Sequence, residues 1–185
     1  MPEHKTIITR LQEAAGKGLK IFLMPGNRDF LLGQEFCQAA GVKLISDPYK
    51  IKLDNKQVLL THGDSLCADD RLYQIYKKLI QHPVTKIIAK NIPVSFLEFI
   101  GQKIQQKTRQ SKAKKTDYIM DVNQDAVKKV SKDIDILIHG HTHKPAIHHY
   151  NSKIRYVLSD WDKKIEILVY ANKRFKLMGL DEIGL

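Results

Sequence analysis

The side chains best suited to chemistry in this 185-residue chain are amide and imidazole groups that fall in three short strings. The strings are Gly26-Asn27-Arg28-Asp29, His62-Gly63-Asp64 and Gly140-His141-Thr142-His143. Imidazole nitrogen and amide oxygen suit borderline ions such as Mn²⁺, Zn²⁺ or Fe²⁺. Two such ions, about 3.5–4 Å apart, can generate a hydroxide and hold both oxygens of a phosphoryl transfer. Each string alone is weak evidence for a metal site; Gly-Asn, for example, is common in turns. The three strings together, in this order, predict a two-metal phosphoesterase centre.

Each string follows a predicted strand, namely residues 19–24, 57–61 and 134–138. Ligands of open α/β sheets bind at the carboxyl ends of the strands. We therefore predict an α/β fold in which Asn27, His62, His141 and His143 come together as metal ligands. A separation above about 10 Å between His62 and His141 would contradict a shared site. Arg28, next to Asn27, could contact phosphate with two parallel hydrogen bonds.

The remaining elements follow from apolar spacing and from Gly and Pro positions. The pattern predicts helices over residues 6–15, 30–40, 71–81, 84–115 and 117–132. It predicts a hairpin with strands 49–53 and 57–61 around a turn at 54–56, and further strands at 146–150, 154–158, 165–170 and 175–178. Cys37 and Cys67 lack CxxC spacing, which favours unpaired reduced thiols.

The formal charge of +11 is concentrated between Lys77 and Lys115, where ten Lys and Arg residues face one acid, Glu98, for a local charge of +9. Such a patch suits nucleic acid, an anionic membrane surface or a phosphate-rich substrate. The apolar run Ile92–Ile100 lies inside this basic stretch. It could contact a membrane surface, form the wall of a groove for acyl chains, or pack the helices together.

The chain resembles the calcineurin-like metallophosphoesterases, whose pattern is DxH, GD, GN(H/R)(D/E), a lone His, and GHxH. More narrowly, it resembles the UDP-2,3-diacylglucosamine diphosphatase family of lipid A biosynthesis. The strings that carry this resemblance are GNRDFLLG from Gly26, THGDSLCADD from Thr61, IMDVNQ from Ile119 and LIHGHTHKP from Leu137. The resemblance covers the chain from Met1 to about Trp161 and weakens beyond it.

The resemblance implies a single α/β/β/α sandwich domain over residues 1–185, with a helical lid at about 71–116 and without the first strands. It implies that Asn27, His62 and His141 hold one Mn²⁺ and that His143 binds the second. It also implies substrate contacts from Asn27, Arg28, Asp70, Thr108, Lys112, Lys115 and His141. For Asp70, a helix N-terminal residue favoured by the helix dipole is the plainer alternative. The implied reaction cleaves the pyrophosphate of UDP-2,3-diacylglucosamine to UMP and 2,3-diacylglucosamine 1-phosphate.

The DxH and GD segments, which would supply three ligands including the bridging carboxylate, do not occur before Asn27. Without them, we expect weak metal binding and little activity. A misplaced start or interrupted gene, a separately encoded N-terminal fragment, and an inactive lipid-binding remnant each account for the pattern.

The resemblance further implies a protein on the cytoplasmic face of the inner membrane of a Gram-negative bacterium, with a lipid surface as partner. A basic nucleic-acid-binding module is the rival from another class, although no recognition motif supports it and no nucleic acid is expected as partner. Binding to DNA compared with binding to anionic liposomes would discriminate the two.

Overall fold

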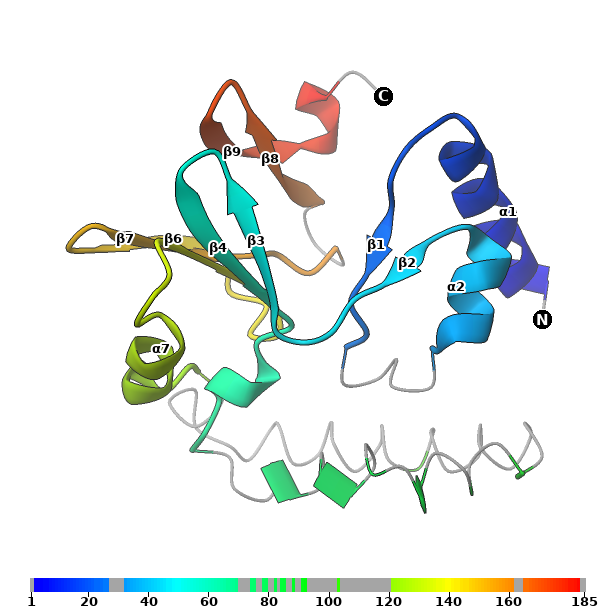
Figure 1. The fold of residues 1–185 in the computed structure, drawn as a ribbon, viewed down its shortest axis with the longest axis horizontal. Coiled ribbons are helices and arrows are strands. Elements are labelled where there is room, and N and C mark those ends of the chain that lie inside the picture. The colour runs from blue at the N-terminus through cyan, green and yellow to red at the C-terminus, as the bar shows by residue number, and fades with distance from the viewer. Residues whose placement is uncertain are drawn as a thin grey trace. The chain divides into compact units, whose positions relative to one another are not determined.

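The computed structural model describes residues 2–26, 32–69, 121–161 and 165–183, together with short pieces at 74–75, 78–79, 82, 84–85, 88, 91–92 and 103. The described residues form a mixed α/β structure with a central sheet (Figure 1). The chain divides into two compact units. The first comprises Met1–Asp64 and Val127–Leu185, and the second comprises Ser65–Ala126.

The central sheet has five strands in the order β3-β4-β5-β7-β6. The strands are β3 (Tyr49–Leu53), β4 (Lys56–Thr61), β5 (Ile136–His139), β6 (Ala146–Tyr150) and β7 (Lys153–Val157). The middle strands β4, β5 and β7 run parallel, while β3 and β6 pair antiparallel at the edges. These strands confirm the predicted hairpin and the predicted strands at 134–138, 146–150 and 154–158 to within two residues.

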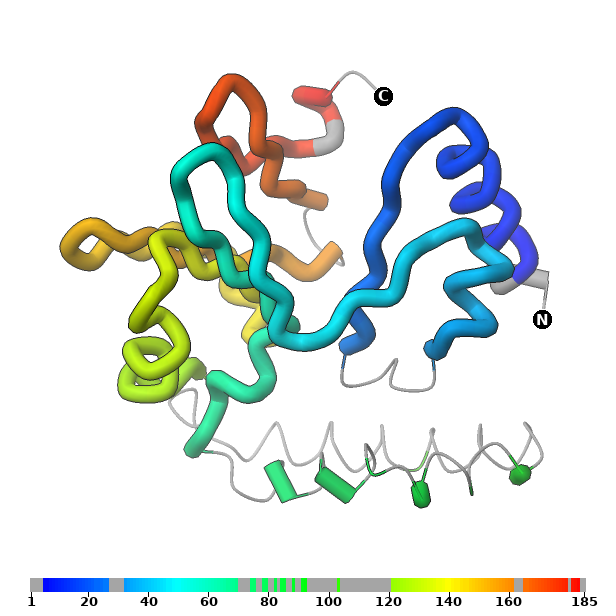
Figure 2. Tube along the Cα trace, viewed as in Figure 1, coloured from blue at the N-terminus to red at the C-terminus, as the bar shows by residue number. Residues whose placement is uncertain are grey.

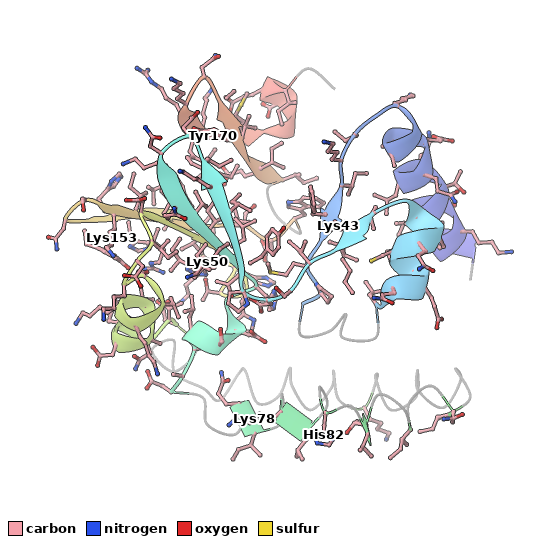
Figure 3. The ribbon with its side chains drawn as sticks, in the orientation of Figure 1. Lys43, Lys50, Lys78, His82, Lys153 and Tyr170 are labelled. Carbon is pink, nitrogen blue, oxygen red and sulfur yellow. The ribbon has the colours of Figure 1, made fainter. Side chains whose placement is uncertain are left out.

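One face of this sheet carries the main hydrophobic core, formed by Val58, Ile136, Ile138 and Tyr156. The hairpin of β8 (Glu166–Ala171) and β9 (Arg174–Gly179) packs on it through Leu168 and Phe175. The rings of Tyr156 and Phe175 lie 5.3 Å apart. Tyr170 on β8, labelled in Figure 3, donates a hydrogen bond to Asp54 in the β3–β4 turn, and this bond is the main cause of its raised pKa.

The opposite face is also buried at its centre, where Leu59, Leu137 and Val157 lie on adjacent strands. Arg155 lies beside Leu137 on this face, because the two residues are register partners. Lys153, two positions earlier on β7, donates hydrogen bonds to the carbonyls of Ser131 and, at 2.8 Å, Lys132. These carbonyls follow helix α7 (Gln124–Val130), and a cation there stabilises a helix end.

The N-terminal elements are helix α1 (Pro2–Gly16), strand β1 (Phe22–Leu23), helix α2 (Gln34–Ala40) and strand β2 (Lys43–Leu44). The tube in Figure 2 follows this order into β3. The prediction of a buried strand over residues 19–24 was wrong in extent. Only two residues pair, with β2, and Phe22 is 51% exposed, because in the described part of the chain this sheet has two strands. Helix α2 begins later than predicted, after Gly33.

Helix α7 also begins later than the predicted residue 117, although 117–120 lie outside the described residues. Asn123 explains the start at Gln124. Its side-chain oxygen accepts hydrogen bonds from the backbone N–H groups of Asp125 and Ala126, at 2.9 and 3.0 Å, as an N-cap does. The helices predicted over 71–81 and 84–115 fall mostly on positions outside the described residues, within the second unit.

Both cysteines are buried and neither forms a disulfide bond, as predicted, and burial raises the pKa of the Cys37 thiol. Among the described residues, no helix has the length and hydropathy that a membrane crossing requires.

Candidate metal centre

The carboxyl ends of β4, β5 and β7 lie at one edge of the sheet, because these three strands are parallel neighbours. Their last residues, Thr61, His139 and Val157, are register partners along that edge. The chain segments that leave the strands carry His62, His141 and Asp160. A polar site at this edge is what the parallel arrangement predicts.

The imidazole rings of His62 and His141 are neighbours, with centroids 5.1 Å apart and planes at 72°. Two imidazoles that share one ion, each with its nitrogen about 2.0–2.1 Å from the metal, need a separation of this order. The structure therefore brings together two of the four predicted ligands, well inside the 10 Å limit. Their binding to a metal ion stays a prediction.

The backbone of His62 is held from both sides. Asp47 accepts hydrogen bonds from the Thr61 hydroxyl at 2.6 Å and from the His62 backbone N–H at 3.1 Å. The His62 carbonyl accepts from the Gly140 N–H at 3.1 Å, which ties the segment after β4 to the segment after β5. The position of the His62 ring thus depends on hydrogen bonds made by the backbone of His62.

Gly63 lies where these two segments approach most closely. Its φ of +104° is a conformation that residues with side chains rarely adopt. A Cβ atom at this position would lie 3.0 Å from the Gly140 carbonyl oxygen and 3.0 Å from Nδ1 of His139. Only glycine fits without displacing the segment that leads to His141.

The string Gly140–His143 forms a tight turn in which the Thr142 N–H donates to the Gly140 carbonyl at 2.9 Å. Both histidines have positive φ, +68° at His141 and +56° at His143. Positive φ costs non-glycine residues free energy and is found preferentially at functional sites. The turn therefore presents its two imidazoles in a conformation that the surrounding hydrogen bonds must maintain.

Asp160 is a functional candidate that the sequence did not single out. Its carboxylate lies 3.0 Å from Nδ1 of His143. A carboxylate on one ring nitrogen fixes the ring orientation and leaves the other nitrogen, Nε2, for a metal ion. The only sequence signal was its place after the predicted strand 154–158, which is the position that His62 and His141 share after theirs.

We predict that Asp160→Ala lowers the affinity for Zn²⁺ or Mn²⁺ by about 10- to 100-fold, the usual effect of losing such a partner. Asp160→Asn should lose less, because the amide oxygen still accepts a hydrogen bond from Nδ1. Isothermal titration with each ion measures both, and the exposed Asp133→Asn is the control for loss of one negative charge. Equal affinities in all three variants would remove Asp160 from the site.

The other predicted site residues lie outside the described residues. These are Asn27, Arg28, Asp70, Thr108, Lys112 and Lys115. Among the positions that the structure does describe, no three His, Cys, Asp or Glu side chains are grouped closely enough to hold an ion. The pair His62 and His141 therefore needs further ligands, and the amide of Asn27 and carboxylates from DxH and GD segments are the predicted ones.

Sequence comparison gives a consistent set of relatives. The chain is 38% identical over 186 residues to a protein of Pseudomonas syringae pv. tomato named UDP-2,3-diacylglucosamine hydrolase, a match that covers 97% of this chain and 75% of the relative. A protein of the same name from Pseudomonas fluorescens SBW25 is 36% identical, with 99% and 76% covered. The chain thus spans about three quarters of the length of these relatives. No family model matches the chain.

Among solved structures, an archaeal phosphodiesterase aligns over 92% of this chain and 74% of its own, with 12% identity and a TM-score of 0.46. We draw no conclusion from a likeness at that level.

Proposed function

The chain belongs to the UDP-2,3-diacylglucosamine hydrolase family, and we propose that it cleaves the pyrophosphate bond of UDP-2,3-diacylglucosamine to give UMP and 2,3-diacylglucosamine 1-phosphate in lipid A biosynthesis. The observation that carries the proposal is the 38% identity over nearly the whole chain to a hydrolase of that name. The adjacent rings of His62 and His141, at the carboxyl edge of the sheet, support it independently, because this reaction type needs metal ions at the phosphoryl group.

The residues fit a metal ion. In the proposal, His62, His141 and Asn27 hold one ion, and His143, oriented by Asp160, binds the second. Bound divalent ions would supply a hydroxide at neutral pH and stabilise charge on the phosphoryl oxygens. The chain itself holds the imidazoles in place through Asp47, Gly63 and the Gly140 amide. Arg28 would orient the pyrophosphate, since guanidinium and phosphate match in geometry.

We propose Mn²⁺ as the physiological ion. The proposed ligands within the described residues are imidazole nitrogens, which suit Mn²⁺, Fe²⁺ and Zn²⁺ alike. Selection among them then depends on the carboxylates contributed by DxH and GD segments. Activity measured after reconstitution with each ion, at equal free concentration, ranks them.

The second unit is proposed as the lipid-facing part. Its described residues include four apolar side chains that are more than half exposed, namely Ile75, Leu79, Val84 and Ile88. Ile75 and Leu79 are four apart, as are Val84 and Ile88, so each pair shares a helix face. With the local charge of +9, these residues suit an anionic lipid surface such as the cytoplasmic face of an inner membrane. Asp70, Thr108, Lys112 and Lys115 are the proposed polar contacts to the substrate.

The reaction is tested by following UMP release from UDP-2,3-diacylglucosamine. Because the 185 residues hold no DxH or GD before Asn27, two polypeptides are compared: these residues alone, and the same residues joined to the DxH- and GD-bearing segment of a relative. We expect little turnover by the first and Mn²⁺-dependent turnover by the second, since the joined segment completes the ligand set. Rapid turnover by the first would show that the added ligands are dispensable. No turnover by a folded, metal-loaded second form would overturn the proposed reaction.

A further inference from the structure

Arg155 is a buried cation for which the proposed reaction gives no role. It is 4% exposed and lies on β7 in the middle of the sheet. Its guanidinium Nη1 donates a hydrogen bond to Nε2 of His139, at 3.1 Å, and its Nε atom has no partner within the described residues. Within the described residues, no carboxylate lies within ion-pair distance of it.

Such a placement is costly for folding. Burial removes the guanidinium from water, and no opposite charge in the described part of the chain compensates it. A buried charge of this kind is often replaced by an apolar side chain of similar volume without loss of stability. A role for Arg155 therefore has to come from its hydrogen bond to His139.

The hydrogen bond determines the state of His139. A guanidinium can only donate, so Nε2 of His139 must accept, and the ring must be neutral with its hydrogen on Nδ1. Nδ1 lies 2.9 Å from the Gly140 carbonyl oxygen, which accepts that hydrogen. His139 is fully buried, so water does not compete for either nitrogen. Arg155, His139 and the Gly140 carbonyl thus form one directed chain of hydrogen bonds.

This chain of hydrogen bonds ends at the Gly140 carbonyl, which belongs to the peptide between Gly140 and His141. The Gly140 N–H, in the preceding peptide, donates to the His62 carbonyl, and the residue after Gly140 is His141. The Gly140 carbonyl also accepts from Thr142 and lies against Gly63. A rotation of this peptide would move His141 relative to His62.

We propose that Arg155 is a positioning residue that acts through His139 to fix the peptide between Gly140 and His141, and thereby the separation of the His62 and His141 imidazoles. Its meaning for catalysis rests on the proposed function, whereas its effect on the turn does not. A residue with a merely structural role would stabilise the fold without selecting a tautomer at His139.

The test uses ¹⁵N NMR of the imidazoles and amide hydrogen exchange on the metal-free protein, with Zn²⁺ titration as a separate readout. The variants are Arg155→Met, which removes the charge and the hydrogen-bond donor, and Arg155→Lys, which keeps the charge. The lysine side chain is one bond shorter than that of arginine, so its ammonium group does not reach Nε2 of His139. Lys153→Met is the matched control, because Lys153 lies on the same strand and face but bonds to the segment after α7.

In the unchanged protein we expect a single Nδ1–H tautomer at His139 and slow exchange of the Gly140 amide. Both Arg155 variants should show mixed tautomers and faster exchange of this amide, while Lys153→Met shows neither. Zn²⁺ affinity should fall by about 10-fold or more in the Arg155 variants, as for other outer partners of a metal ligand. If Arg155→Met does not fold, Arg155→Lys alone decides.

An Nε2–H tautomer in the unchanged protein, or an Nδ1–H tautomer that persists in folded Arg155 variants, overturns the proposal. If the unchanged protein shows the expected tautomer but binds no Zn²⁺, even when completed with DxH and GD ligands, the proposed metal function fails. The positioning of the turn by Arg155 would then stand by itself.

Discussion

Replacement of His62 by alanine is expected to abolish tight metal binding and to lower the rate of UDP-2,3-diacylglucosamine cleavage by more than about 100-fold. Loss of an outer partner of a ligand costs about 10- to 100-fold, and loss of the ligand itself should exceed that. The centroids of the His62 and His141 rings lie 5.1 Å apart, so the change removes one of the two neighbouring imidazoles and leaves only that of His141. The measurements are metal content, metal affinity and the cleavage rate in the form that carries DxH and GD.

The fold should survive this change. The hydrogen bonds that hold this segment come from the His62 backbone N–H to Asp47 and from the Gly140 N–H to the His62 carbonyl, and alanine retains both groups. The control is His149→Ala on edge strand β6, where the side chain is exposed. It should leave affinity, rate and thermal midpoint unchanged. A His62→Ala protein that binds metal and turns over normally would remove His62 from the centre.

The edge of the sheet at which the site lies could be predicted from the sequence, because strands with strong apolar patterns end just before His62 and His141. Alternation and composition locate such strands to within about two residues. The partners that hold the site could not. Asp47 and Asp160 reach His62 and His143 through tertiary contacts, across 15 and 17 positions of sequence. Nothing local to either aspartate marks it as such a partner.

Arg155, for which no prediction was made, illustrates a different limit of sequence patterns. In the alternating stretch 153–157, a charged residue reads as facing solvent. The central strands are buried on both faces, as the continuous burial of β5 shows, so that reading does not hold in the middle of this sheet. The opposite error occurred at β1, where a continuous apolar run predicted burial but Phe22 is half exposed. Periodicity reports local pattern, whereas burial depends on which neighbours the sheet provides.

Helix starts failed for a third reason. The apolar spacing extends N-terminal of the observed starts of α2 and α7, but the first turn of a helix depends on capping. Asn123 satisfies the first free N–H groups of α7, and a helix that begins at Gln124 is the result. Capping depends on single side chains, so spacing alone misplaces the boundary.

Replacement of Gly63 by alanine is expected to destabilise the protein by about 2–6 kcal/mol. Roughly 1–3 kcal/mol follows from a positive φ that alanine adopts with strain, and about 1–3 kcal/mol from overpacking. The added Cβ would meet the Gly140 carbonyl oxygen and His139 Nδ1, both at 3.0 Å, and the His139 Cβ at 3.2 Å. Two of these atoms belong to the fully buried His139 side chain, whose ring Arg155 also holds, so it has little freedom to move away.

For a chain of this size, that loss corresponds to a fall in the thermal midpoint of roughly 4–24 °C, measurable by calorimetry or circular dichroism. Gly140→Ala, on the facing segment, is the matched control, because its φ is not positive and its added Cβ would lie 3.6 Å from the His62 carbonyl, an ordinary contact. It should change stability by less than about 1 kcal/mol. A similar loss in both variants would indicate general sensitivity of the turn. A loss confined to Gly63→Ala would show that the close approach of the two histidine-bearing segments at this glycine is what the fold requires.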